Sequence, residues 1–315
     1  MCADSAAVEI PPGATPAVVL CYSFGSSLYH RLVAQAREFR LLGRSSEPSW
    51  DAAVRRVADL YLPLGPFNWF EYPLLRAENV SELSAALKDR TALFAQEFGE
   101  ALASVADDYR TRFWEEDHTT LDHTLDDLRG RLSSVKDTLL TGLARQLELA
   151  LGSTPFEVTL VPHCHEPTGA YSHPIAIGVD RFAGASLVEV LLHEVGHVAA
   201  SRTHTEREGG LASVRTACER RGRTEHFALE LFHLILFHAA GQLVRSVCDS
   251  SYTTLASRRN VYARLGAKLG SQLTERDVQV IWNRRERGEV ELDAVVEELN
   301  ARLKEAIPQR STRSG

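Results

Sequence analysis

The residues best suited to chemistry are His193, Glu194 and His197, which form a His-Glu-x-x-His motif. Residues four apart lie one turn above each other on the same face of a helix, so both imidazoles can bind a single metal ion. Glu194 lies beside them, where its carboxylate can take a proton from a metal-activated water without being a ligand. The motif therefore predicts a hydrolytic metal site.

The residues around the motif predict a helix from about Ser186 to Arg202. Most of its other positions are apolar, and His and Glu side chains without partners would be costly in such a setting. A metal ion supplies that partner. Ser186 and Glu189 have the spacing of a capping box, which predicts that the helix begins at Ser186.

A catalytic zinc site needs a third protein ligand, and the segment 224–241 is the expected source. It is apolar on all sides, which is typical of a buried central helix, so its polar residues need partners. The candidates are Glu225, His226, Glu230, His233 and His238. We favour His233 because it lies in the middle of the most apolar run. Glu230 precedes it by one turn, placed to orient its ring or to ligate instead.

On these residues the chain resembles the zincin-like metallopeptidases, over roughly residues 156–245. The resemblance implies that His193, His197 and a third residue bind Zn²⁺. It also implies that Glu194 is the general base and that the substrate is a peptide or a small amide. The run 232–241 is similar to a helix in a group of uncharacterised bacterial proteins that carry the same motif.

Two branches of that superfamily fit less well. In the metzincin branch the helix-turning Gly and the third ligand would fall at Ala200 and Thr203, so this branch is excluded. In the gluzincin branch the ligand is a Glu on a later helix, with an acidic residue four positions on. Glu225 and Glu230 are each followed there by a leucine, so neither matches fully.

Two other functions remain open. Glu194-x-x-His197 and Glu230-x-x-His233 are two copies of the pair used by di-iron carboxylate bundles, and a long helical region could supply Glu97 or Glu100. That arrangement would make an oxidase. The third alternative is a zincin-shaped binding protein without turnover.

Two strands, over 156–161 and 175–179, are predicted before the motif helix because their residues alternate and are β-branched. A sheet edge beside the metal would let a peptide add itself as another strand. Tyr171 and His173, between these strands, are candidate oxyanion or substrate contacts. His163, Cys164 and His165 could hold a second metal, with at most two of them converging.

The expected fold class is α+β and predominantly helical, with a zincin-like core, a small sheet beside the motif helix and an N-terminal helical region. The expected domains are 1–151, which is helical, and 152–308, which binds the metal; 309–315 is expected to be a disordered tail. Helical periodicity over 81–113 and 119–151 predicts an antiparallel hairpin with an acidic corner between its arms. Residues 17–22 are either a strand or the start of a helix.

Composition limits the partners. The chain has 315 residues, an apolar fraction of 44% and a formal charge of −7 without a basic stripe, so neither nucleic acid nor a membrane is expected as a partner. The N-terminus lacks a basic segment and a long apolar run. The five cysteines are few and widely spaced, which favours reduced thiols and a cytoplasmic location.

Overall fold

The structure is a computed structural model that describes residues 16–43, 46–64, 77–79, 81–82, 85, 93–166, 168–203, 210–268 and 273–303. The predicted tail 309–315 lies outside the described residues. The chain divides into two compact units. The first comprises Met1–Ser134 and Ser153–Val195, and the second Val135–Gly152 and Gly196–Gly315. Compactness does not test independent folding, so the predicted boundary at 151–152 stays a prediction.

The first unit contains a small mixed sheet, so the α+β, mostly helical class is confirmed. Its strand order is β1-β2-β4-β3, with the strands at Val18–Cys21, Phe156–Val161, Ile175–Gly178 and Ala170–Ser172. β1, β2 and β4 are parallel, and β3 runs antiparallel to β4. β2 has the predicted bounds, and β4 ends one residue early. β3 lies between the two predicted strands and was not predicted itself. Three residues are too few to show alternation, and the pairing with β4 defines the strand.

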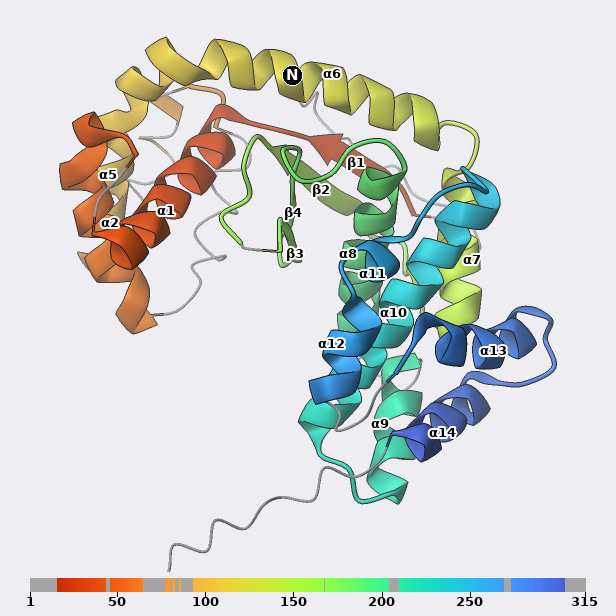
Figure 1. Cartoon of the computed structure of the whole chain (residues 1–315). Helices are drawn as coiled ribbons and strands as arrows, with labels where there is room; N and C mark the ends of the chain where they lie inside the picture. The colour runs from red at the N-terminus through yellow and green to blue at the C-terminus, as the bar shows by residue number, and fades with distance from the viewer. Residues whose placement is uncertain are drawn as a thin grey trace, which may run out of the picture. The chain divides into compact units, whose positions relative to one another are not determined.

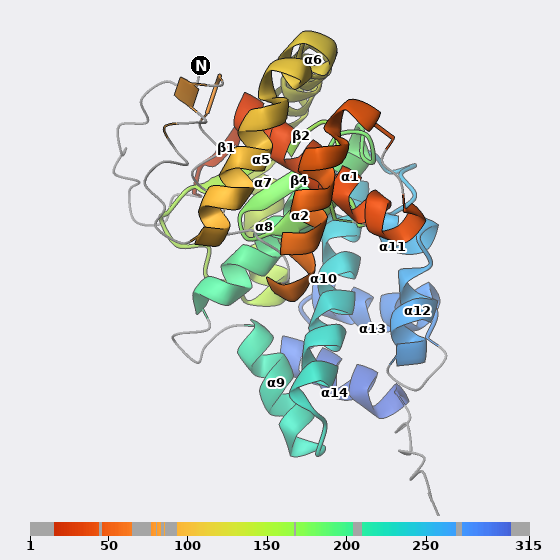
Figure 2. The same cartoon turned by 90° about the vertical axis from the view of Figure 1, so that its left-hand side faces the viewer.

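Three helices of the first unit pack together: α1 (Phe24–Leu42), α2 (Asp51–Leu64) and α5 (Leu93–Tyr109). Figures 1 and 2 show them side by side. α1 begins where the Ser23 hydroxyl accepts the Ser26 N–H at 3.1 Å. Their shared core is rich in fully buried aromatic and aliphatic side chains, among them Phe24, Leu28, Tyr29, Leu32 and Phe98.

The predicted hairpin is wrong, because the chain stays helical where a corner was expected. A π-helical turn over Arg110–Trp114 leads directly into α6 (Glu115–Leu132), and α5 packs on α1 and α2 instead. In the first turn of α6, Asp117 accepts hydrogen bonds from Tyr109 at 2.8 Å and Arg31 at 3.3 Å. Its carboxylate is therefore buried in the unit and does not form a solvated corner. The break comes later, before α7 (Lys136–Leu147).

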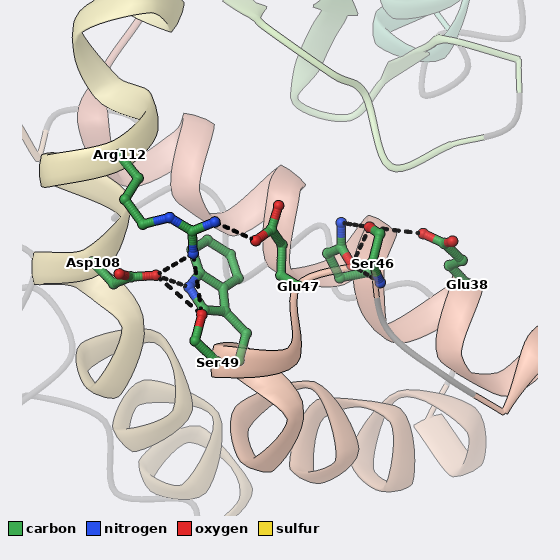
Figure 3. Close-up of polar contacts among 8 residues, drawn as sticks. Glu38, Ser46, Glu47, Ser49, Asp108 and Arg112 are labelled. Carbon is green, nitrogen blue, oxygen red and sulfur yellow. Dashed lines mark hydrogen bonds and ion pairs between the residues drawn. The ribbon is translucent and has the colours of Figure 1, made fainter.

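A polar cluster ties the α1–α2 connection to this π-helical region (Figure 3). The Asp108 carboxylate accepts the Trp50 indole N–H at 2.6 Å and an Arg112 N–H at 2.9 Å. Arg112 also pairs with Glu47 at 2.7 Å. A charged group that bridges two segments in this way fixes their spacing, so the cluster sets how α2 begins against the end of α5.

The second unit is helical and organised around α10 (Glu225–Val247). Besides the second half of α8 (Ala185–Thr203), its described residues also form α7, α9 (Gly210–Arg220), α11 (Leu255–Arg258), α12 (Val261–Lys268), α13 (Glu275–Glu286) and α14 (Leu292–Arg302). α10 contacts α7, α9, α11 and α12, and Figure 2 shows it between α9 and α12. The predicted buried helix over about 224–247 is confirmed, with the Thr224 hydroxyl accepting the Phe227 N–H at 3.2 Å.

Within the described part of the chain, α10 is the one helix long and apolar enough to cross a membrane by length and composition. Of that apolar window, 72% is buried inside the protein. Core helices give the same pattern.

Candidate metal centre

The His-Glu-x-x-His motif lies on α8 (Ala185–Thr203), as its apolar surroundings predict. The boundary between the two units falls inside this continuous helix, after Val195. The helix starts one residue earlier than expected, and the capping-box prediction is wrong. The Ser186 hydroxyl instead donates to the Ala183 carbonyl at 2.8 Å and accepts the Ala183 N–H at 3.1 Å. Glu189 is fully buried.

His193, His197 and His233 form a cluster that could hold a metal ion. One ligand atom from each residue lies within 4.8 Å of the other two. His193 is 3% exposed, and the other two side chains are half-buried. The favoured third candidate is thus the α10 residue that comes near the motif.

The approach of α8 to α10 explains how His233 reaches the motif. A Cβ at Gly196 would lie 2.4 Å from Leu236 Cδ1, so only glycine fits there without displacing a buried leucine. One residue further, the His197 ring centroid is 5.0 Å from that of His233 and 6.5 Å from that of Phe232. Gly196 therefore permits the close helix contact that brings the two histidines together.

The other α10 candidates have partners of their own. Glu230 accepts from Lys268 at 2.8 Å, and Glu225 pairs with Arg215 at 2.6 Å. His238 lies 2.7 Å from the Tyr262 hydroxyl, and the His226 side chain is 79% exposed. The cluster therefore contains three imidazoles and no carboxylate.

The acids proposed for a di-iron site are also engaged or exposed. Glu97 and Glu100 lie on the exposed side of α5, and Glu100 pairs with Arg56 at 3.1 Å. No carboxylate belongs to either metal-capable group in the described part of the chain.

Glu194 is only 6% exposed, and burial raises its pKa to about 8. Burial also lowers the pKa of His233, which keeps its imidazole neutral and able to offer a lone pair at neutral pH. Three imidazoles that converge in this way fit Zn²⁺ as a donor set. The arrangement could therefore bind a divalent ion beside a buried carboxyl group whose raised pKa favours its protonated form.

The candidates before α8 belong to the sheet region of the first unit. The Tyr171 hydroxyl is 3.2 Å from His30 Nε2, and His173 is exposed. His163 Nδ1 is 3.1 Å from the Asp180 carboxylate. Of the three residues 163–165, two converge, Cys164 and His165, and they do so with His30. They are adjacent, and strand alternation would have separated them; both lie outside β2 and β3. Sequence reasoning missed His30, although it lies on the buried face of an apolar helix and so needs a partner.

The comparisons with known proteins add no relative. No protein-family model matches the chain, and neither does any curated protein or solved structure. The residues of the site therefore carry the function proposed below.

Proposed function

We propose that the protein is a zinc-dependent hydrolase of peptides or other amides, with a zincin-like core around α8. The supporting observation is the convergence of His193, His197 and His233, with ligand atoms within 4.8 Å of one another. Three histidines are a donor set of catalytic zinc sites, where the fourth position stays open for water or substrate.

When bound, zinc supplies a Lewis acid that lowers the pKa of water and polarises a carbonyl group. Glu194 then takes the proton of the attacking water and returns it to the leaving amine nitrogen as the C–N bond breaks. Burial favours the protonated form of Glu194, and a divalent ion bound beside it would favour the carboxylate form that accepts this proton. Tyr171 and His173 are proposed as oxyanion or substrate contacts; the Tyr171 hydroxyl would have to serve both the substrate and His30.

Metal analysis tests the site first. Protein purified without added metal should contain zinc, and His193→Ala or His197→Ala should each remove one equivalent per chain. His226→Ala is the matched control, because this side chain is 79% exposed and outside the cluster. Two irons per chain would support the di-iron oxidase instead. An unchanged zinc content in both motif variants would overturn the proposal.

Glu194→Gln tests the chemistry, because it keeps the shape of the side chain and removes the proton acceptor. We expect full metal content and a loss of about 10²–10⁴-fold in the cleavage rate of a peptide library followed by mass spectrometry. Glu225→Gln, on the surface of α10, should leave the rate unchanged. Metal loss in Glu194→Gln would identify Glu194 as a ligand, as the di-iron alternative requires.

We also propose a cytoplasmic location, with no nucleic acid and no membrane as partner. The acidic balance of −7 and the widely spaced cysteines support it. None of the four cysteines in the described residues forms a disulfide with another. Cell fractionation of the tagged full-length chain tests the location: recovery in the membrane or secreted fraction would contradict it.

A further inference from the structure

A second cluster of metal-binding side chains lies wholly within the first unit, on α1 and on the connection from β2 to β3. A ring nitrogen of His30, a ring nitrogen of His165 and the Cys164 Sγ all lie within 4.8 Å of one another. His30 is 0% and His165 4% exposed, and Cys164 is half-buried. None of these residues belongs to the α8 and α10 cluster, so a ligand here would be a separate one.

The hydrogen bonds locate the lone pair of each ring, and an ion bound by His30 Nδ1 would replace the hydrogens that this atom accepts. The His165 backbone N–H donates to His30 Nδ1 at 3.2 Å, so this atom is an acceptor. The two Nδ1 atoms are 2.9 Å apart, which requires the hydrogen between them to be on His165 Nδ1. His165 Nε2 is then a bare acceptor on a side chain of 0% exposure.

That acceptor is the unusual feature of the cluster. His165 Nε2 has no hydrogen-bond partner among the described residues; Glu166 Oε1, at 3.6 Å, is itself an acceptor. A buried acceptor without a donor is unfavourable and calls for an explanation. A cation would satisfy it, and the Cys164 thiolate and the Glu166 carboxylate would offset the charge of a divalent ion.

We propose that His30, Cys164 and His165 bind a second, structural zinc ion. Thiolate with imidazole selects zinc over magnesium or calcium. On tetrahedral zinc the ligand atoms lie about 3.3–3.6 Å apart for bonds of roughly 2.0–2.3 Å. The ligand atoms of the three residues, now within 4.8 Å of one another, would move closer together on the ion. Arg37 donates to the His165 carbonyl at 2.7 Å and pairs with Glu166 at 3.5 Å, which holds the segment against α1.

Cobalt substitution tests the proposal, because cobalt bound to a thiolate has a near-ultraviolet charge-transfer band that an all-histidine site lacks. The full-length His193→Ala, His197→Ala double variant should bind one cobalt per chain and show this band. Cys164→Ser in that background should abolish it, and addition of zinc should displace it. Cys21→Ser and His163→Ala are matched controls from the same unit, outside the cluster, and should keep the band.

A second measurement covers the case in which a variant does not fold. Zinc added to the folded wild-type chain should slow alkylation of Cys164 by about tenfold or more, because a metal-bound thiolate is no longer a free nucleophile. Peptide mass spectrometry locates the alkylated cysteine. The proposal is overturned if the double variant shows no band, if the band survives Cys164→Ser, or if zinc leaves the alkylation rate of Cys164 unchanged.

Discussion

The imidazole ring centroids of His197 on α8 and His233 on α10 are 5.0 Å apart. Both rings belong to the second unit, so their spacing is fixed by the packing of two helices inside one compact body. Phe232 and Phe237 lie next to them, with ring centroids 6.5 Å from His197 and 4.9 Å from His233. These two phenylalanine rings pack against the imidazoles and restrict their orientation.

His233→Ala should therefore weaken zinc binding at this site more than any other single change on α10. Glu230→Gln should lower the zinc affinity by only about 10–100-fold, the usual effect of changing a residue that contacts a metal ligand but not the metal. Competition with a chromogenic chelator measures both affinities. If the ranking were reversed, Glu230 would be the ligand and the site would resemble the gluzincins.

Gly196→Ala should destabilise the second unit by about 1–3 kcal/mol, the usual range for overpacking a core. Its Cβ would meet Leu236 Cδ1 at 2.4 Å, and Leu236 is fully buried. Chemical denaturation measures the free energy of unfolding. In the double variant Gly196→Ala, Leu236→Ala the shortened side chain makes room for the new methyl group. Its loss in the free energy of unfolding should therefore be smaller than the sum of the losses in the two single variants. Strict additivity would mean that the two positions do not collide. Gly130→Ala is the control, since a Cβ there meets nothing within 4 Å.

Acid should destabilise the protein through His238. Burial lowers its pKa from 6.5 to about 3, with the positive charge of Arg245 adding to the effect, while the Tyr262 hydroxyl and the Trp282 ring face it. Between pH 6.5 and about 3, His238 is therefore protonated in the unfolded chain and neutral in the folded chain. The contribution of neutral His238 to the free energy of unfolding is complete above pH 6.5. It is lost as pH falls from 6.5 towards 3, by up to about 1.4 kcal/mol per pH unit.

His238→Gln removes this titration, so the free energy of unfolding should depend less steeply on pH between 6.5 and 3. Denaturation series at several pH values, with a chelator present throughout, provide the comparison. His226→Gln, on the exposed side of the same helix, should leave the wild-type slope unchanged. Equal slopes in wild type and His238→Gln would show that His238 is not the buried neutral base.

All five cysteines should titrate as thiols after denaturation. In the native protein we expect Cys248 to react early, because it is exposed. Cys218 should react only on unfolding, because burial hides it and raises its pKa to about 11. Timed alkylation with mass spectrometry gives the order. Two or more cysteines in disulfides would contradict the reduced state and the proposed location.

Local patterns predicted the elements that depend on local chemistry. The bounds of β2, the course of α8 and the buried α10 all follow from alternation or apolar runs within a single segment. The helical periodicity over 119–151 is confirmed only in part: Leu121, Leu125, Leu128 and Leu132 of α6 are buried, but the helix ends at Leu132 and a separate helix, α7, begins at Lys136. His233 was chosen because a histidine in an apolar run needs a partner, and the structure brings it to the motif.

Features set by distant contacts were not predictable in this way. The acidic run at Glu115–Asp117 indicates a surface turn on its own, and only Tyr109 and Arg31 make it part of a continuous helix. β3 is a strand only because β4 lies beside it. His30 meets His165 across 135 positions of sequence, and no spacing rule reaches so far.

The pairing of β1 with β2 has a consequence for synthesis on the ribosome. Val18 lies opposite Phe156, and β1 has no other strand neighbour within the described sheet. At roughly 5–20 residues per second, the partner of β1 is made about 7–28 s after β1 itself. α1, α2 and α5 can assemble during that interval, whereas β1 must wait as an unpaired apolar strand. We therefore expect a nascent chain stalled before residue 156 to depend on a chaperone, and one released after β4 to be independent of it.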